Sequence, residues 1–249
     1  MMRIVRPVVT ISGLLALWHG AYLLNGRRSY LLPSPWETLQ TGVARFDSLW
    51  GHALVTWGEI LLGLMLGTLL GTISAVVLVS WATARRWLMP LLVVSQAVPV
   101  FALAPLLVLW LGYGLGSKVA MATLIIYFPV ASAFLDGLRR TEPGWLDQAR
   151  MMNAGRWATL WHLRLPAALP ALASGLRVAA AVAPIGAVVG EWVGSSAGLG
   201  YLMLHANARM QIDVMFAALA LLAVFSVALY RIVDAAMRRL VSWQTETNA

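Results

Sequence analysis

The chain has 249 residues, of which 60% are hydrophobic and only 11% are charged. A soluble domain of this length carries about 25% charged residues, so the composition excludes a soluble enzyme, a disordered chain and a coiled coil. The formal net charge of +8 raises nucleic-acid binding as an alternative. The basic residues are scattered around apolar runs rather than gathered in a dense stripe, which excludes that alternative as well. The composition predicts a protein embedded in a lipid bilayer.

Six apolar runs along the chain are long enough to cross that bilayer, whose core of about 30 Å needs about 20 residues of helix. They cover residues 7–26, 60–84, 87–117, 119–135, 166–190 and 214–230. The run at 166–190 contains one charged residue, Arg177, and the other runs contain none. Strand alternation is missing. We therefore predict an all-α membrane protein with about six transmembrane helices, forming a single transmembrane domain over residues 1–249.

The distribution of basic residues predicts the orientation of these spans. Cytoplasmic segments carry an excess of Lys and Arg. With the N-terminus inside, the inner segments hold 12 basic residues and the outer segments hold 5. We therefore expect both termini to be cytoplasmic and the protein to lie in the cell inner membrane as a multi-pass protein.

Small residues recur on one face of the second run, where Gly63, Gly67 and Gly71 form two overlapping GxxxG units. This spacing lets two helix backbones approach closely in lipid. It favours packing between helices of the same bundle, with an interface between two copies of the chain as the alternative.

The third run contains Gln96 and Pro99, and proline interrupts helical hydrogen bonding. Irregular backbone at membrane depth is tolerated where protein or a water-filled cavity receives its polar groups, so this break indicates either a translocation path or a kink packed against neighbours.

A charged residue within a membrane span is energetically costly and therefore indicates a functional site. Arg177 and Glu191 are 14 residues apart, about 21 Å along one helix, and do not pair directly. We take Gln96, Pro99 and Glu191 as candidates for lining the path.

Sites for catalysis, metals and cofactors are not expected. The segment GYGLGSK at 112–118 fails the phosphate-loop pattern, because Ser117 precedes Lys118 and Val119 follows it. The four histidines are dispersed and have no metal-ligand spacing. Any nucleotide hydrolysis must therefore occur on another subunit.

The polar loop at about 139–165 is the most informative segment. Residues Trp145–Met152 are predicted to form a short helix, with Glu142 and Pro143 suiting its start and Asn153 or Gly155 suiting its end. A second amphipathic piece, 157–165, then runs to Pro166, where the next span is expected to begin. The loop is either a lever for a peripheral partner or a simple surface loop.

This loop resembles the EAA motif of ABC importer permeases, which reads E-A-A, three residues, G, nine residues, I-x-L-P. Asp147, Gln148 and Ala149 stand at its first three positions, Asn153 at the glycine, Leu163 at the isoleucine and Leu165-Pro166 at its end. Asp, Gln and Asn replace the family's Glu, Ala and Gly. The segments at 32–35, 98–114, 164–177 and 198–203 are similar to permeases of the nitrate, sulfonate and taurine group, and 190–216 is similar to hydroxymethylpyrimidine permeases.

The resemblance implies half of a type I importer, with two permease copies, two ATPase subunits docked on the loop and an extracytoplasmic binding protein. The residues implied to couple the permease to the ATPase are Asp147, Gln148, Ala149, Arg150, Asn153, Gly155, Leu165 and Pro166. The implied substrate is hydroxymethylpyrimidine, a thiamine precursor, with sulfonate, taurine or nitrate as alternatives. A stand-alone secondary transporter is the competing class, and it would show inverted repeats and paired intramembrane ionisable residues. We see neither in the sequence.

Overall fold

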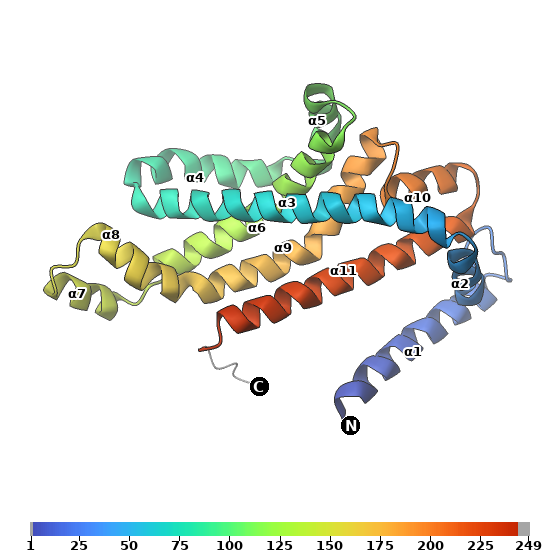
Figure 1. Ribbon diagram of the computed structural model, residues 1–249, viewed down its shortest axis with the longest axis horizontal. Coiled ribbons are helices and arrows are strands. Elements are labelled where there is room, and N and C mark those ends of the chain that lie inside the picture. The colour runs from blue at the N-terminus through green and yellow to red at the C-terminus, as the bar shows by residue number, and fades with distance from the viewer. Residues whose placement is uncertain (1, 244–249) are drawn as a thin grey trace. The chain divides into compact units, whose positions relative to one another are not determined.

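The computed structural model describes residues 2–243, and for residues 2–8, 91, 93 and 95–97 it describes the backbone alone. Within that range every regular element is helical (Figure 1), which confirms the all-α prediction. The elements are α1 (Met2–Leu24), α2 (Pro35–Ala44), α3 (Phe46–Ser80), α4 (Ala82–Ala97), η1 (Val100–Leu103), α5 (Ala104–Leu111), α6 (Leu115–Arg139), α7 (Pro143–Met151), α8 (Arg156–Thr159), η2 (Leu160–Arg164), α9 (Leu165–Gly194), α10 (Leu199–Ala208) and α11 (Ile212–Leu240).

Four helices among the described residues are long and apolar enough to cross a membrane. They are α3, α6, α11 and the helix that runs from Arg156 to Gly194. Two shorter apolar helices, Val9–Leu24 and Val100–Leu111, correspond to the first and third predicted spans. The six apolar runs are therefore all helical, but they differ in length and continuity.

The third predicted span is broken rather than continuous. Helix α4 ends at Ala97, Val98 and Pro99 adopt extended backbone, and the chain resumes as the 3-10 turn η1 and the short helix α5. Proline has no N–H for the helical ladder, and it disfavours helical backbone at the residue before it. Pro99 thus divides the run at the position where a break in helical hydrogen bonding is predicted from the sequence.

The residues form two compact units, which we describe separately. The first contains 1–56 and 196–224, and the second contains 57–195 and 225–249.

In the first unit, side chains of α3 cap the start of α10. The backbone N–H of Gly198 donates to Nδ1 of His52 at 3.0 Å, and that of Leu199 donates to Oγ1 of Thr56 at 2.7 Å. Gly198 has φ of 110°, which suits a residue without a Cβ. The two contacts satisfy N–H groups that a helix start leaves unpaired. His52 therefore has a capping role at the start of α10.

In the second unit, α6 packs against both α3 and α9 at very short range (Figure 1). A Cβ added at Gly63 would lie 2.5 Å from the Cβ of Ala122, and one at Gly67 or Gly71 would meet Ile126 or Val130 of the same helix. The GxxxG face of α3 therefore packs within the chain, which confirms the favoured interpretation. On the other side of α6, Gly175 and Gly186 of α9 approach it equally closely.

These contacts predict opposite effects for one substitution at two sites of α3. We expect Gly63→Ala to lower the free energy of unfolding by about 1–3 kcal/mol, because the new methyl overlaps Ala122. Gly51 is in the same helix and has no atom within 4 Å of an added Cβ. We expect Gly51→Ala to be neutral or to stabilise by up to about 1 kcal/mol, because alanine favours helix. Thermal unfolding of the purified protein in detergent tests both, and equal effects would contradict the packing.

Candidate functional site

The segment between α6 and α9 forms two short helices, as the sequence predicts. Pro143 occupies the first turn of α7, where its missing N–H costs nothing, and Glu142 is the residue before the helix. The helix ends at Met151. Asp147, Gln148, Ala149 and Arg150 therefore all lie on α7, within one and a half turns of its C-terminal end.

Asn153 makes the turn that follows α7. It has φ of 53°, its N–H donates to the carbonyl of Arg150 at 2.9 Å, and the N–H of Ala154 donates to that of Ala149 at 2.9 Å. This is the pair of bonds that defines a Schellman motif, and asparagine is the residue that best replaces glycine in it. Gly155 differs from the expectation, because its φ of −64° is open to any residue and it begins α8 instead.

The second amphipathic piece runs without interruption into the membrane helix. Helix α8 continues through the π turn η2 into α9, so that one helix extends from Arg156 to Gly194. Leu165 and Pro166 start α9 directly after the π turn. Because proline has no N–H for the bond to the preceding turn, a local change of helical hydrogen bonding at this point is expected. The span begins earlier than Pro166, contrary to the prediction.

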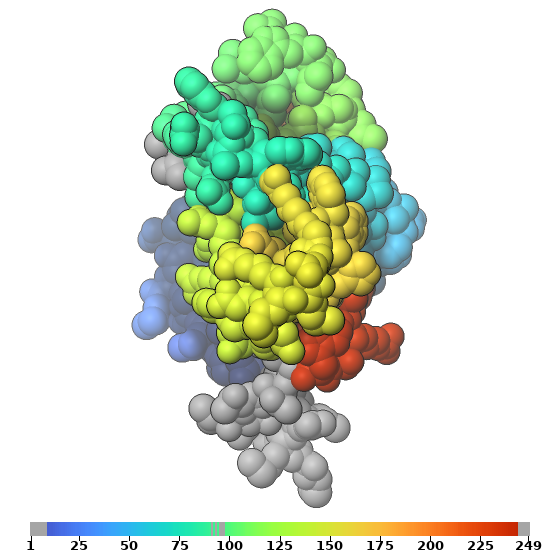
Figure 2. Space-filling view, turned by 90° about the vertical axis from the view of Figure 1, so that its left-hand side faces the viewer, coloured from blue at the N-terminus to red at the C-terminus, as the bar shows by residue number. Residues whose placement is uncertain are grey.

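The α7–α8 segment, residues 143–159, presents a mostly uncovered surface, which faces the viewer in yellow in Figure 2. Met151 and Met152 are 81% and 77% exposed, and Trp157 is 53% exposed. Exposed apolar side chains in such number mark interaction sites. Methionine and tryptophan are also enriched in protein interfaces.

Two cavities flank these helices. A cavity of about 570 Å³ opens between α7 and α8 and is lined mainly by apolar side chains, among them Trp145, Ala149, Met152 and Leu163. A second cavity of about 280 Å³ has a basic lining that includes Arg150, Arg156 and Arg164. The segment therefore offers an apolar groove next to a positively charged one.

Asp147 and Arg150 form an ion pair on the surface of α7. Arg150 Nη1 lies 2.8 Å from Asp147 Oδ1, and the two side chains are 77% and 67% exposed. Exposed pairs of this kind add about 0.2–1 kcal/mol to stability. Both side chains are free to face a partner, and the fold does not depend on them.

The candidates for the translocation path lie on different elements of the fold. Pro99 is exposed at the break between α4 and η1. Glu191 lies near the C-terminal end of α9 and is only 1% exposed. The side chain of Gln96 lies outside the part of the chain that the structure describes. No described contact joins Pro99 to Glu191, so their role in a path stays a prediction.

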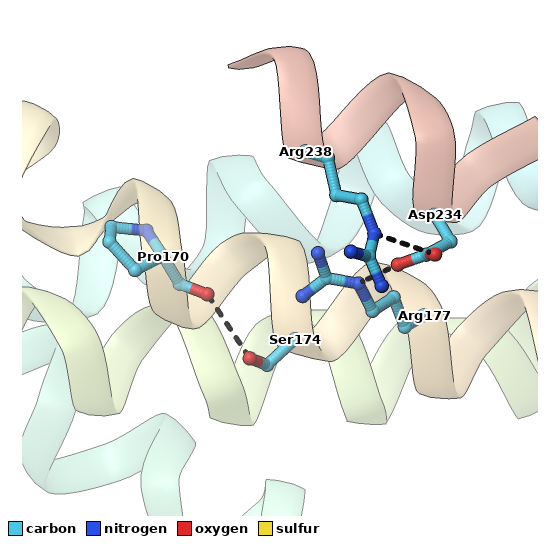
Figure 3. A network of polar contacts seen from close by, with 5 residues as sticks. All are labelled: Pro170, Ser174, Arg177, Asp234 and Arg238. Carbon is cyan, nitrogen blue, oxygen red and sulfur yellow. Dashed lines mark hydrogen bonds and ion pairs between the residues drawn. The ribbon is translucent and has the colours of Figure 1, made fainter. Parts of the chain in front are cut away.

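Arg177 belongs to an ion-pair network between α9 and α11, shown in Figure 3. Its Nε lies 2.7 Å from Asp234 Oδ1, and Nε of Arg238 lies 3.0 Å from Asp234 Oδ2. The side chains of Arg177 and Asp234 are 27% and 18% exposed, whereas that of Arg238 is 58% exposed. Arg177 is therefore neutralised by Asp234 of α11, a partner that sequence reasoning missed.

Comparison with known proteins extends over nearly the whole chain. Residues 67–243 match the family model described as "binding-protein-dependent transport system inner membrane component". A probable ABC transporter permease protein of Haemophilus influenzae is 53% identical over 96% of this chain and 98% of its own length. The riboflavin transport system permease protein RibX of Chloroflexus aurantiacus is 36% identical (95% and 89%), and the formylaminopyrimidine transport permease protein ThiX of Halalkalibacterium halodurans is 32% identical (96% and 95%).

The fold is also that of a solved transporter subunit. A chain of the MetNI methionine ABC transporter, solved in inward-facing conformations, superposes with a TM-score of 0.69 over 80% of this chain and 98% of its own length. The sequence identity is 19%, so this likeness concerns the fold alone.

The network in Figure 3 predicts unequal effects for its two arginine contacts. We expect Asp234→Asn to lower the free energy of unfolding by about 1–3 kcal/mol, because it removes the counter-charge of both arginines, of which Arg177 is half-buried. Arg238→Gln removes an exposed partner of the same carboxylate, and we expect a loss below about 1 kcal/mol. Thermal unfolding in detergent measures both. Equal losses of stability in the two variants would mean that the half-buried contact of Arg177 contributes nothing beyond the exposed contact of Arg238.

Proposed function

The chain belongs to the family of binding-protein-dependent transport system inner membrane components, and we propose that it imports a pyrimidine precursor of thiamine. It is the multi-pass permease subunit of an ABC importer of type I, a transport component of the inner membrane. We further propose that ATP is hydrolysed on a separate subunit, that two copies of the chain form the pathway, and that residues 1–249 act as one transmembrane domain.

The proposed ATPase contact is the α7–α8 segment, and its exposed apolar and charged surface is the observation that carries this assignment. Asp147, Gln148, Ala149 and Arg150 lie on α7, and the Schellman turn at Asn153 fixes the angle to the next helix. An apolar groove and a basic cavity at this segment suit a protein partner whose contact surface combines apolar and acidic groups.

Continuity of the helix from Arg156 to Gly194 supports a mechanical role for this contact. A force applied at α8 acts directly on α9, because no loop separates them and Leu165 and Pro166 continue the same helix. Packed helices switch between discrete arrangements rather than deforming gradually. Closure of the ATPase would then shift α9 as a rigid body and change the access to the pathway.

We propose that the α7–α8 segment lies on the cytoplasmic side of the membrane, together with both termini. Basic residues cluster on and beside the α7–α8 segment, at Arg139, Arg140, Arg150, Arg156 and Arg164. Such an excess of positive charge favours the cytoplasmic side. The binding protein would deliver substrate at the other side, where Glu191 remains a candidate for the path along with Gln96 and Pro99.

The substrate assignment rests on the similarity of residues 190–216 to hydroxymethylpyrimidine permeases. Relatives whose names state transport of formylaminopyrimidine and of riboflavin are 32% and 36% identical to the chain. Both are nitrogen heterocycles, which favours a substrate of that chemical class. Sulfonate, taurine or nitrate is the second candidate, supported by the resemblance to that permease group.

The ATPase contact predicts the effect of a charge reversal on α7. We expect Asp147→Arg to abolish co-purification of the ATPase subunit with the tagged permease, because it breaks the pair with Arg150 and adds positive charge to a basic surface. Asp47→Arg makes the same reversal at an exposed residue of α3 and serves as the control. Recovery of the ATPase with both variants would contradict the contact, and so would its loss with both.

The substrate proposal predicts ATP-dependent uptake of a labelled pyrimidine by proteoliposomes that contain the permease, its ATPase and its binding protein. We expect hydroxymethylpyrimidine, and not taurine or nitrate, to compete for uptake and to raise the melting temperature of the binding protein. Competition by taurine with no effect of the pyrimidine would favour the second candidate. Uptake by the permease alone without ATP would instead indicate a secondary transporter.

A further inference from the structure

Three ionisable side chains lie buried together inside the second unit. Glu59 of α3 and Glu191 of α9 are each 1% exposed, and Lys118 of α6 is 5% exposed. All three belong to helices that are candidates to span the membrane. Burying charge is costly, so intramembrane ionisable groups mark functional sites and are paired. The expectation from the sequence that paired intramembrane ionisable groups are missing is therefore wrong.

The contacts among these side chains are specific. The carboxyl group of Glu59 is hydrogen-bonded to that of Glu191, and Lys118 acts on Glu59 through its charge. Lys118 Nζ donates to the carbonyl oxygens of Tyr113 and Gly114 at 2.9 and 3.1 Å. These are the charged groups that bear on Glu59 from α6 and α9 in the described part of the chain.

The surrounding backbone encloses the cluster. A Cβ added at Gly190 would lie 3.1 Å from the Cα of Lys118, so α9 and α6 touch beside Glu191. Ile60, which follows Glu59, is 1% exposed in the apolar core with Ala122 and Ala187. Solvent therefore does not stabilise an isolated charge at this position, and the charges within the cluster must neutralise one another.

Counting protons defines the charge state. An ionised carboxylate only accepts hydrogen bonds, so two carboxyl groups bond to each other only when at least one of them is protonated. With both protonated, the charge of the buried Lys118 would have no counter-charge. With one proton, the pair carries a charge of −1 and Lys118 carries +1, and the cluster is neutral. With no proton, two adjacent carboxylates would repel each other and leave an uncompensated charge in an apolar interior.

The hydrogen-bonding pattern indicates which residue holds the proton. Oε2 of Glu59 is buried and has no hydrogen-bond partner among the described residues. An unpaired oxygen is less costly on a neutral acid than on a charged carboxylate. Glu59 is accordingly the protonated acid that donates, and Glu191 is the carboxylate that accepts and balances Lys118.

We propose that Glu59 and Glu191 form an intramembrane proton-binding site that, balanced by Lys118, joins α3, α6 and α9 at the end of α9 remote from α7. The bound proton is a structural part of the bundle. Lys118 also holds the loop at 112–114 through its bonds to the carbonyl oxygens of Tyr113 and Gly114. Because Glu191 balances the charge of Lys118, it has a positioning role that is separate from its proposed role in the path. The inference does not depend on the identity of the transported substrate.

Infrared difference spectroscopy of the full-length protein in lipid detects this proton directly. A protonated carboxyl group has a carbonyl stretch well separated from that of a carboxylate, and the band shifts in D2O. We expect the band in the wild type, its loss in Glu59→Gln, and its retention in the control Glu142→Gln, which changes an exposed glutamate. An unchanged band in Glu59→Gln would overturn the proposal.

Thermal unfolding of charge-counting variants gives an independent test. Glutamine at 59 still donates to Glu191 and keeps the cluster neutral, so we expect Glu59→Gln to match the wild type within about 3 °C. The double variant Glu59→Gln/Glu191→Gln leaves Lys118 unbalanced, and we expect its melting temperature to fall by about 6–20 °C.

Three results would contradict this charge count. Loss of stability in Glu59→Gln equal to that of the double variant would mean that Glu59 must be charged. A clear gain in Glu59→Gln would mean that both carboxyl groups are ionised in the wild type. A double variant as stable as the wild type would mean that Glu191 does not balance Lys118.

Discussion

The close approach of α6 to α3 and α9 is the constraint on which the second unit of this permease depends. Lipid is as apolar as leucine, so helices in a membrane gain little from burying apolar surface and associate through short-range packing. Glycines of α3 and α9 leave no room for a Cβ against Ala122, Ile126 and Val130 of α6. The backbones are thus close enough for polar side chains to meet across the interfaces without water.

Two polar clusters lie at different levels of α9, one at its contact with α11 and one at its contacts with α3 and α6. Arg177 pairs with Asp234 of α11 in the part of α9 nearer to α7, and Glu191 meets Glu59 and Lys118 near its C-terminal end. Gly186 lies between the two clusters and Gly175 lies just before Arg177, and both hold α9 against α6. The polar clusters limit rotation and sliding of α9 through charge, and the glycine contacts limit them through steric fit.

Much of this arrangement could be predicted from local sequence, because it depends on local physical chemistry. Apolar runs give the helices, Pro143 starts α7, and the left-handed turn falls on Asn153. What local patterns do not contain is the partner of a residue distant in sequence. Asp234 is 57 residues from Arg177. Glu59 and Lys118 stand at the edges of apolar runs, where no local pattern marks them as partners of Glu191. The broken third run was likewise ambiguous, since a proline fixes where helical bonding fails but not how the chain continues.

Rigidity of α9 links the two ends of the second unit. The helix begins on the exposed α8, passes the ion pair at Arg177 and ends beside the buried carboxyl pair, without an intervening loop. A displacement of α8 therefore cannot be absorbed in a hinge at Leu165–Pro166 unless the π turn that precedes them changes its hydrogen bonding. The π turn and the two prolines inside α9, Pro170 and Pro184, are the points where helical hydrogen bonding is interrupted between the exposed segment and the remote cluster. If the helix keeps its shape at these points, a movement of α8 must be borne by the glycine contacts with α6 and by the two polar clusters together.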